Sequence, residues 1–155
     1  MIIRAAFLVT ALTLMPLPAA AQAANLTGEW RRFPRAGTAQ AIDPLEPESE
    51  TIVQTLLDVQ ITQRWGTRVL AQTRTFDGVE RDSATLSGSV RTTSLWQGDR
   101  LVTATRRTVS LPQGTATVDV REVRYLDGDR MMLDITWTSG TTTLNRRVSY
   151  ARVLQ

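Results

Sequence analysis

Polar and apolar residues alternate along most of the chain beyond residue 50. In residues 56–63, for example, Leu57, Val59 and Ile61 are separated by polar side chains. Alternation with a period of two is typical of a β-strand with one buried face, and the sequence after residue 25 lacks the 3.6-residue period of an amphipathic helix. The pattern therefore predicts an all-β protein.

Short turns that contain glycine separate the alternating runs. Two of them, Asp127-Gly128 and Ser139-Gly140, join neighbouring runs directly, as hairpin turns do. We predict about eight antiparallel strands, which cover residues 26–33, 56–63, 68–76, 84–96, 100–109, 115–125, 130–137 and 142–153. An up-and-down barrel or a strongly curved sheet leaves such a series with few free edges.

Residues 34–50 break the alternation. This stretch contains three prolines, and Asp43, Glu46, Glu48 and Glu50 have no basic neighbour in it. Proline and unpaired like charges favour an extended, solvated chain. We therefore expect a long loop here and no functional site.

The motif Asp127-Gly128-Asp129 suggests either a cation-binding loop or a hairpin turn. A calcium loop needs several further oxygen ligands, but Arg130 and two methionines follow. The similar segment at residues 95–101 keeps the glycine and has glutamine in place of the first aspartate. Because glycine is the shared feature, we expect a turn with Asp127 and Gly128 as its central residues, and no metal site.

These turns predict which strand positions lie opposite one another. The first turn pairs Arg124 with Met131 and Glu122 with Leu133, and the turn centred on Ser139-Gly140 pairs Leu133 with Arg146. Both turns place one apolar set on the same face, which should be buried: Val118, Val120, Met131, Leu133, Ile135, Trp137, Leu144 and Val148. Glu122, Arg124 and Arg146 fall on this apolar face as well.

Charged residues on an apolar face need partners, because an unpaired buried charge costs several kcal/mol. We expect Glu122 and Arg146 to pair, or to lie at a wet end of the barrel. In one interpretation the charges form an ion-pair network without a ligand. In the other, Arg107, Arg124, Arg146 and Glu122 line a cavity that binds a small anionic or amphiphilic molecule through guanidinium contacts. The sequence leaves both open.

Composition excludes most catalytic chemistry. The chain contains no histidine, no cysteine and no lysine, so it lacks catalytic triads of the Ser-His-Asp type, thiolate or imidazole metal sites and Schiff-base chemistry. The formal net charge of +3 is too small to indicate nucleic-acid binding. We expect a protein that is not an enzyme and uses no cofactor or metal.

The first residues are typical of a secretory signal. Arg4 precedes an apolar run, and Ala21-Gln22-Ala23 fits a cleavage site, so we expect residues 1–23 to be removed. The run from Ala5 to Leu17 is too short to span a bilayer. Residues 24–155 then form a single β-barrel domain without a transmembrane segment, in the periplasm or outside a bacterial cell.

Three motifs in this order resemble small secreted bacterial proteins described as lipocalin-like: Gly28-Glu29-Trp30, the Gly-Asp-Arg hairpins at residues 96–101 and 126–133, and the closing strand at 147–153. The resemblance implies that Trp30 closes the barrel floor under an arginine, for which Arg146, Arg147 or Arg152 could serve. It implies either a barrel that binds a small amphiphilic or anionic ligand, or a filled, non-enzymatic structural or interaction module of the cell envelope. The chain is shorter than most lipocalins and lacks their disulfide.

Overall fold

A computed structural model describes residues 23–33, 45–85 and 88–154, so residues 1–22 of the predicted signal peptide lie outside the described part. Ten strands form one sheet. They are β1 (Gly28–Arg32), β2 (Ser49–Gln54), β3 (Asp58–Trp65), β4 (Arg68–Thr75), β5 (Arg81–Thr85), β6 (Gly88–Gln97), β7 (Arg100–Leu111), β8 (Gly114–Asp127), β9 (Arg130–Ser139) and β10 (Thr142–Arg152).

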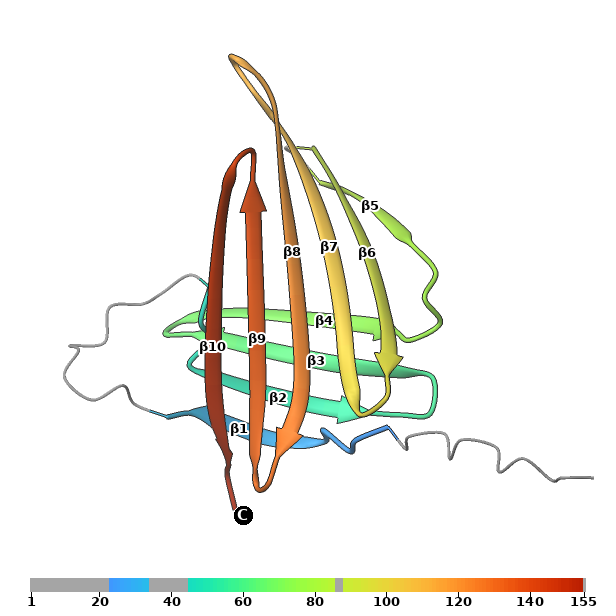
Figure 1. The fold of residues 1–155 in the computed structure, drawn as a ribbon, viewed down its shortest axis with the longest axis vertical. Helices are drawn as coiled ribbons and strands as arrows, with labels where there is room; N and C mark the ends of the chain where they lie inside the picture. The colour runs from blue at the N-terminus through green and yellow to red at the C-terminus, as the bar shows by residue number, and fades with distance from the viewer. Residues whose placement is uncertain (1–22, 34–44, 86–87, 155) are drawn as a thin grey trace, which may run out of the picture.

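The sheet is antiparallel throughout and folds over on itself. Its order is β4-β3-β2-β1-β10-β9-β8-β7-β6-β5, so β1 pairs with both β2 and β10 and connects the two halves. Strands β1–β4 run across the long strands β6–β10 as a second layer (Figure 1). The predicted all-β, strongly curved sheet is confirmed. In the described part of the chain, no helix is long and apolar enough to cross a membrane.

The described residues contain ten strands, not about eight, because two short strands escaped the sequence pattern. Strand β2 begins inside the stretch predicted to be a loop, and β5 begins in a predicted turn and is separate from β6. Each has only five or six residues, too few for alternation to stand out beside proline or acidic neighbours. Strands β4 and β5 are the two ends of the sheet order, so the ladder does not close between them.

The hairpin turns place glycine one position earlier than predicted. Asp127 pairs with Arg130 and Ser139 with Thr142, so Gly128 and Gly140 are the first central residues of their turns, with φ of 61° and 57°. A positive φ at the first central residue is what a type II′ hairpin turn requires.

The predicted register is therefore wrong by two residues. Arg124 lies opposite Leu133, not Met131, and Leu133 lies opposite Val148, not Arg146. A shift of two residues preserves the direction in which each side chain points.

Half of the predicted apolar face lies in the core. Its members Met131, Leu133, Ile135 and Val148 are buried, and they pack with residues of the crossing layer, including Trp30, Ile52, Val59 and Ile61. Trp137 and Val120 are only half-buried, and Leu144 is 38% exposed. These three lie farther along the long hairpins, so burial on this face decreases away from the crossing layer.

Trp30 is buried on β1, where the two halves of the sheet meet, and an arginine covers it as the resemblance implied. Its ring is 1% exposed, and its indole N–H donates to the Leu26 carbonyl at 2.8 Å. Of the three candidate arginines, Arg152 covers the ring, with its guanidinium carbon 4.5 Å from the ring centroid. Arg152 also donates to the Thr27 carbonyl at 2.8 Å and so joins the C-terminal strand to the start of β1.

Candidate functional site

The predicted site residues share the inward direction but not the same surroundings. Arg124 on β8 is 1% exposed and faces the crossing layer, whereas Arg107 on β7 is exposed and Arg146 on β10 is 37% exposed. Glu122 lies opposite Thr103 on β7 and Ile135 on β9. It is the inward-facing residue that precedes Arg124 on β8. The inner face therefore has a buried polar part and a more open part.

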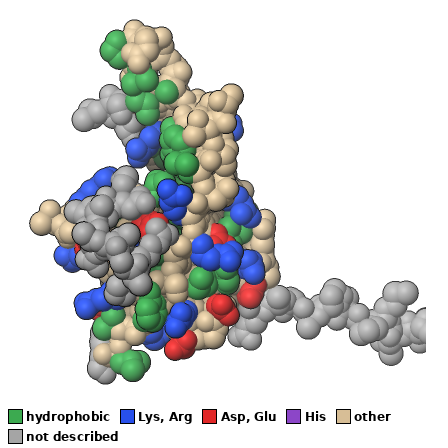
Figure 2. Space-filling model, turned by 60° about the vertical axis from the view of Figure 1, so that its left-hand side comes forward, with side chains coloured by type: hydrophobic (Ala, Val, Ile, Leu, Met, Phe, Trp, Pro, Cys, Tyr) green, Lys and Arg blue, Asp and Glu red, His purple; other side chains and the backbone are tan. Residues whose placement is uncertain are grey.

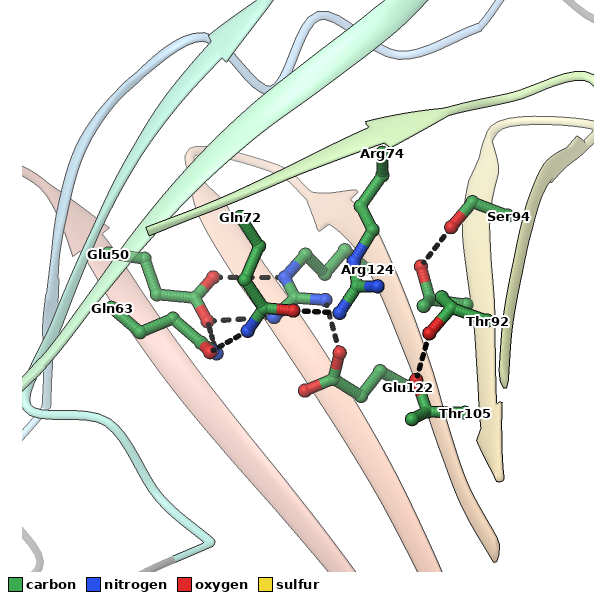
Figure 3. A network of polar contacts seen from close by, with 10 residues as sticks. Glu50, Gln63, Gln72, Arg74, Thr92, Ser94, Thr105, Glu122 and Arg124 are labelled. Atoms are coloured by element: carbon green, nitrogen blue, oxygen red, sulfur yellow. Dashed lines mark hydrogen bonds and ion pairs between the residues drawn. The ribbon is translucent and has the colours of Figure 1, made fainter. Parts of the chain in front are cut away.

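The buried part is built around an ion pair between the two layers. Arg124 donates from Nε and Nη2 to both oxygens of Glu50 on β2, at 3.0 and 2.8 Å (Figure 3). Glu50 is fully buried and also accepts a 2.7 Å hydrogen bond from the Gln63 side-chain amide. This bidentate geometry compensates for removing both charges from water.

Arg124 uses its remaining nitrogen to hold a second carboxylate. Nη1 of Arg124 donates to Glu122 at 3.2 Å. Burial lowers the pKa of Arg124, but the charges of Glu122 and Glu50 outweigh this effect and raise it above its usual range. Burial alone would raise the pKa of Glu122, but Arg124 and Arg74 lower it overall, so both groups remain ionised.

The predicted pair between Glu122 and Arg146 is wrong in its partners. Glu122 pairs with Arg124, its neighbour two residues along the same strand, and Arg146 lies 3.9 Å from Glu46. The shift in register does not explain this, because Glu122 and Arg146 still flank one residue of β9, Ile135 in place of Leu133. The cause is that Arg124 meets its carboxylate from the opposite layer.

The expectation that the acidic segment is a solvated loop is also wrong for its described end. Glu46 and Glu50 are buried, and Glu46 accepts a 3.3 Å hydrogen bond from Arg32. Composition alone missed Glu50. In β2, Glu50 and Ile52 are buried whereas Thr51 and Val53 are exposed, so polar and apolar residues do not alternate with burial and the sequence carried no such signal.

Hydroxyl groups extend the polar interior toward β5. Ser94 and Thr103 are hydrogen-bonded at 3.0 Å, and the Thr92 and Thr105 hydroxyls lie 3.5 Å apart (Figure 3). Beside them is a small cavity of about 120 Å³ between β4 and the β5–β6 hairpin, lined by Thr73, Arg74, Thr75, Arg81, Ser83, Thr92 and Ser94. Its volume suits a few waters or a small polar group and not a whole lipid.

The open part of the inner face carries a row of four side chains, three of which are apolar. Thr105, Val120, Trp137 and Leu144 lie opposite one another on four consecutive strands, β7 to β10. Arg107 lies two residues beyond Thr105 on the same side of β7, and no described ion pair includes it. An exposed guanidinium thus lies close to a half-buried apolar strip.

The described residues contain no cluster of acidic side chains that could hold a metal ion. The carboxylates of Glu50 and Glu122 share the guanidinium of Arg124. Such an arrangement can hold the layers together or contact a polar ligand.

No protein-family model and no curated protein matches the chain. Solved structures do match its fold. A structure described as the REP1-NXSQ fatty acid transporter has a TM-score of 0.56 and 14% identity, with 84% of this chain and 97% of that chain covered. Human cRBP IV has a TM-score of 0.53 and 16% identity, with 84% and 99% covered.

A third match comes from a different group of proteins. A secretory abundant heat soluble (SAHS) protein from Ramazzottius varieornatus has a TM-score of 0.55 and 9% identity, with 87% of this chain and all of that chain covered. Identities this low show a shared fold alone. The chain therefore shares the curved antiparallel architecture of these proteins.

Proposed function

We propose that the protein binds a small amphiphilic anion on the open inner face of its curved sheet. The observation that carries this proposal is the half-buried row of Val120, Trp137 and Leu144 with the exposed Arg107 beside it. Apolar surface left uncovered beside a free guanidinium fits a ligand with an apolar tail and a charged head.

The shape of the molecule supports a ligand at this place. The long hairpins extend past the crossing layer (Figure 1), and hydrophobic side chains follow one another along this projecting part with basic side chains nearby (Figure 2). The buried part is already occupied, because each of the three guanidinium nitrogens of Arg124 donates a hydrogen bond to Glu50 or Glu122. A ligand would therefore contact Arg107 and Arg146 more readily than Arg124.

The fold neighbours add a general expectation. One bears the name of a fatty acid transporter, and all share the curved sheet with this chain. We take a long-chain carboxylate as the first probe for this reason. The protein would act as a carrier or a scavenger, with no reaction of its own.

Dodecanoate and dodecanol separate the two parts of this proposal. We expect dodecanoate to change the tryptophan fluorescence of the purified protein in a saturable way, and W137F to remove most of that signal. The variant R107M should weaken dodecanoate binding by about tenfold while leaving dodecanol binding unchanged. W65F is the matched control, because Trp65 lies at the β3–β4 turn.

A saturable fluorescence change that survives in W137F would place the ligand elsewhere and contradict the proposal. Absence of binding of either compound would favour the second candidate, a non-enzymatic structural or interaction module. The filled ion-pair network between the layers is the observation that favours this second function.

We also propose that the protein is exported after cleavage near Ala23, to the periplasm or the outside of a bacterial cell. The apolar run and the small residues before Ala24 support this location. The intact mass of the protein recovered from cells would test it, since an uncleaved chain in the cytoplasm would contradict it.

A further inference from the structure

The outward face of the long strands carries a second, separate feature. A hollow of about 520 Å³ lies over β6–β10, and a smaller one of about 260 Å³ lies beside it. Arg121 on β8 and Thr136 on β9 line both hollows. The side chain of Arg121 points away from the interior, because it alternates with the inward-facing Val120 and Glu122.

Arg121 lies at the centre of this face without a counter-charge. It lies opposite Ala104 on β7 and Thr136 on β9, neither of which can neutralise it. Its guanidinium is exposed, and it takes part in none of the hydrogen bonds or ion pairs formed by the described residues. It therefore differs from most arginines on this face.

The nearest carboxylates on this face are already taken. Asp119, two residues before Arg121 on β8, accepts hydrogen bonds of 2.7 and 3.3 Å from Arg106. Asp134, two residues before Thr136 on β9, accepts hydrogen bonds of 2.6 and 2.9 Å from Arg147. Each aspartate is matched by its own arginine, so Arg121 is in excess and the face has a local positive charge.

The larger hollow also offers an apolar floor. Val102 and Val123 are opposite one another on the outward face and are 6% and 5% exposed. The Arg100 guanidinium, which also lines the hollow, is held over the Tyr125 ring at 4.2 Å from its centroid. A second cation is thereby fixed at the edge of the apolar floor.

We propose that this outward face binds a small organic anion, with its carboxylate or phosphate on Arg121 and its apolar part over Val102 and Val123. A planar guanidinium binds either head group through two parallel hydrogen bonds. A volume of about 520 Å³ lies within the range of small-molecule sites. The site is on the opposite face of the sheet from the proposed amphiphile site and does not depend on it.

Phenyl phosphate, benzoate and benzyl alcohol test this site on the purified protein by two-dimensional amide NMR. We expect phenyl phosphate or benzoate to shift the amide signals of Ala104, Arg121, Val123 and Thr136, and the tighter of the two identifies the head group. R121M should weaken that binding at least about tenfold. R64M, which removes an exposed arginine from the outside of β3, should bind as the wild type does.

Three results would overturn the inference. Equal weakening by R64M and R121M would mean that the anion responds only to the total charge. Binding of benzyl alcohol as tight as that of the anions would remove the role of Arg121. Shifts confined to other residues, or no shifts at all, would show that the outward hollow is not a site. An unchanged amide spectrum of unliganded R121M away from position 121 verifies that the variant is folded.

Discussion

At the scale of single residues, the contact between Glu50 and Arg124 has the largest structural consequence. Both side chains are excluded from water, and each lies in a different layer of the fold. A buried ion pair contributes little net stability compared with apolar residues, but removal of one partner leaves the other charged and unsolvated. The pair therefore makes each layer depend on the other.

We expect Arg124→Met to destabilise the protein by about 3–5 kcal/mol, because Glu50 would remain buried without its cation. The double variant R124M/E50Q should recover much of this loss. Urea denaturation of the single and double variants measures the coupling energy. R124M/E122Q is the matched control and should recover less, because Glu122 retains 22% exposure.

If the losses of stability caused by R124M and E50Q simply add in the double variant, the two side chains are not coupled and the prediction is wrong.

Sequence reasoning correctly placed Arg124 and Glu122 on the inner face, because direction follows from alternation within one strand. It could not identify Glu50 as the partner, since 74 residues separate Glu50 from Arg124 and no local pattern connects them.

At the scale of elements, glycine sets the geometry of the hairpins in two different ways. Gly128 has a φ of 61° in its turn, and an added Cβ there would meet no atom within 4 Å. Gly88 begins β6 with a φ of 151°, and an added Cβ would lie 1.8 Å from the Thr108 carbonyl oxygen on β7. The first glycine is needed for its backbone conformation alone, and the second also for the close approach of a neighbouring strand.

Gly128→Ala should therefore cost about 1–2 kcal/mol, the strain of a left-handed residue. Gly88→Ala should cost more, because the β6–β7 ladder must also shift to admit the methyl group. Thermal unfolding of the two variants compares them directly. A smaller loss for G88A than for G128A would mean that β6 and β7 separate easily at that end.

The elements also show where sequence patterns suffice. Eight strands and their turns were predictable because alternation and glycine are local signals. The register was wrong by two residues because either central position of a hairpin turn can hold a glycine with positive φ. Strands β2 and β5 were missed because they are short and lie beside acidic or turn-forming residues.

At the scale of the whole molecule, β1 connects the two halves, and the contact of Arg152 with Trp30 closes that junction. We expect Arg152→Met to cost about 1–2 kcal/mol, through loss of the cation–π contact and the hydrogen bond to Thr27. Arg147→Met is the control and should change stability little, because its pair with Asp134 is exposed. If R152M and R147M lower the melting temperature equally, Arg152 contributes no more to stability than an exposed arginine, and the prediction is wrong.

The amino-acid sequence by itself determined the all-β class, the directions of the side chains on each strand and the glycine turns, because each depends on residues close together in the chain. Only the tertiary structure decided which charges meet, how far the crossing layer covers the inner face and which arginine covers Trp30. These depend on how the sheet bends and crosses itself, which brings β2 against β8 and the C-terminal strand against β1. Glu50 changes from an expected loop residue to a buried one for this reason alone.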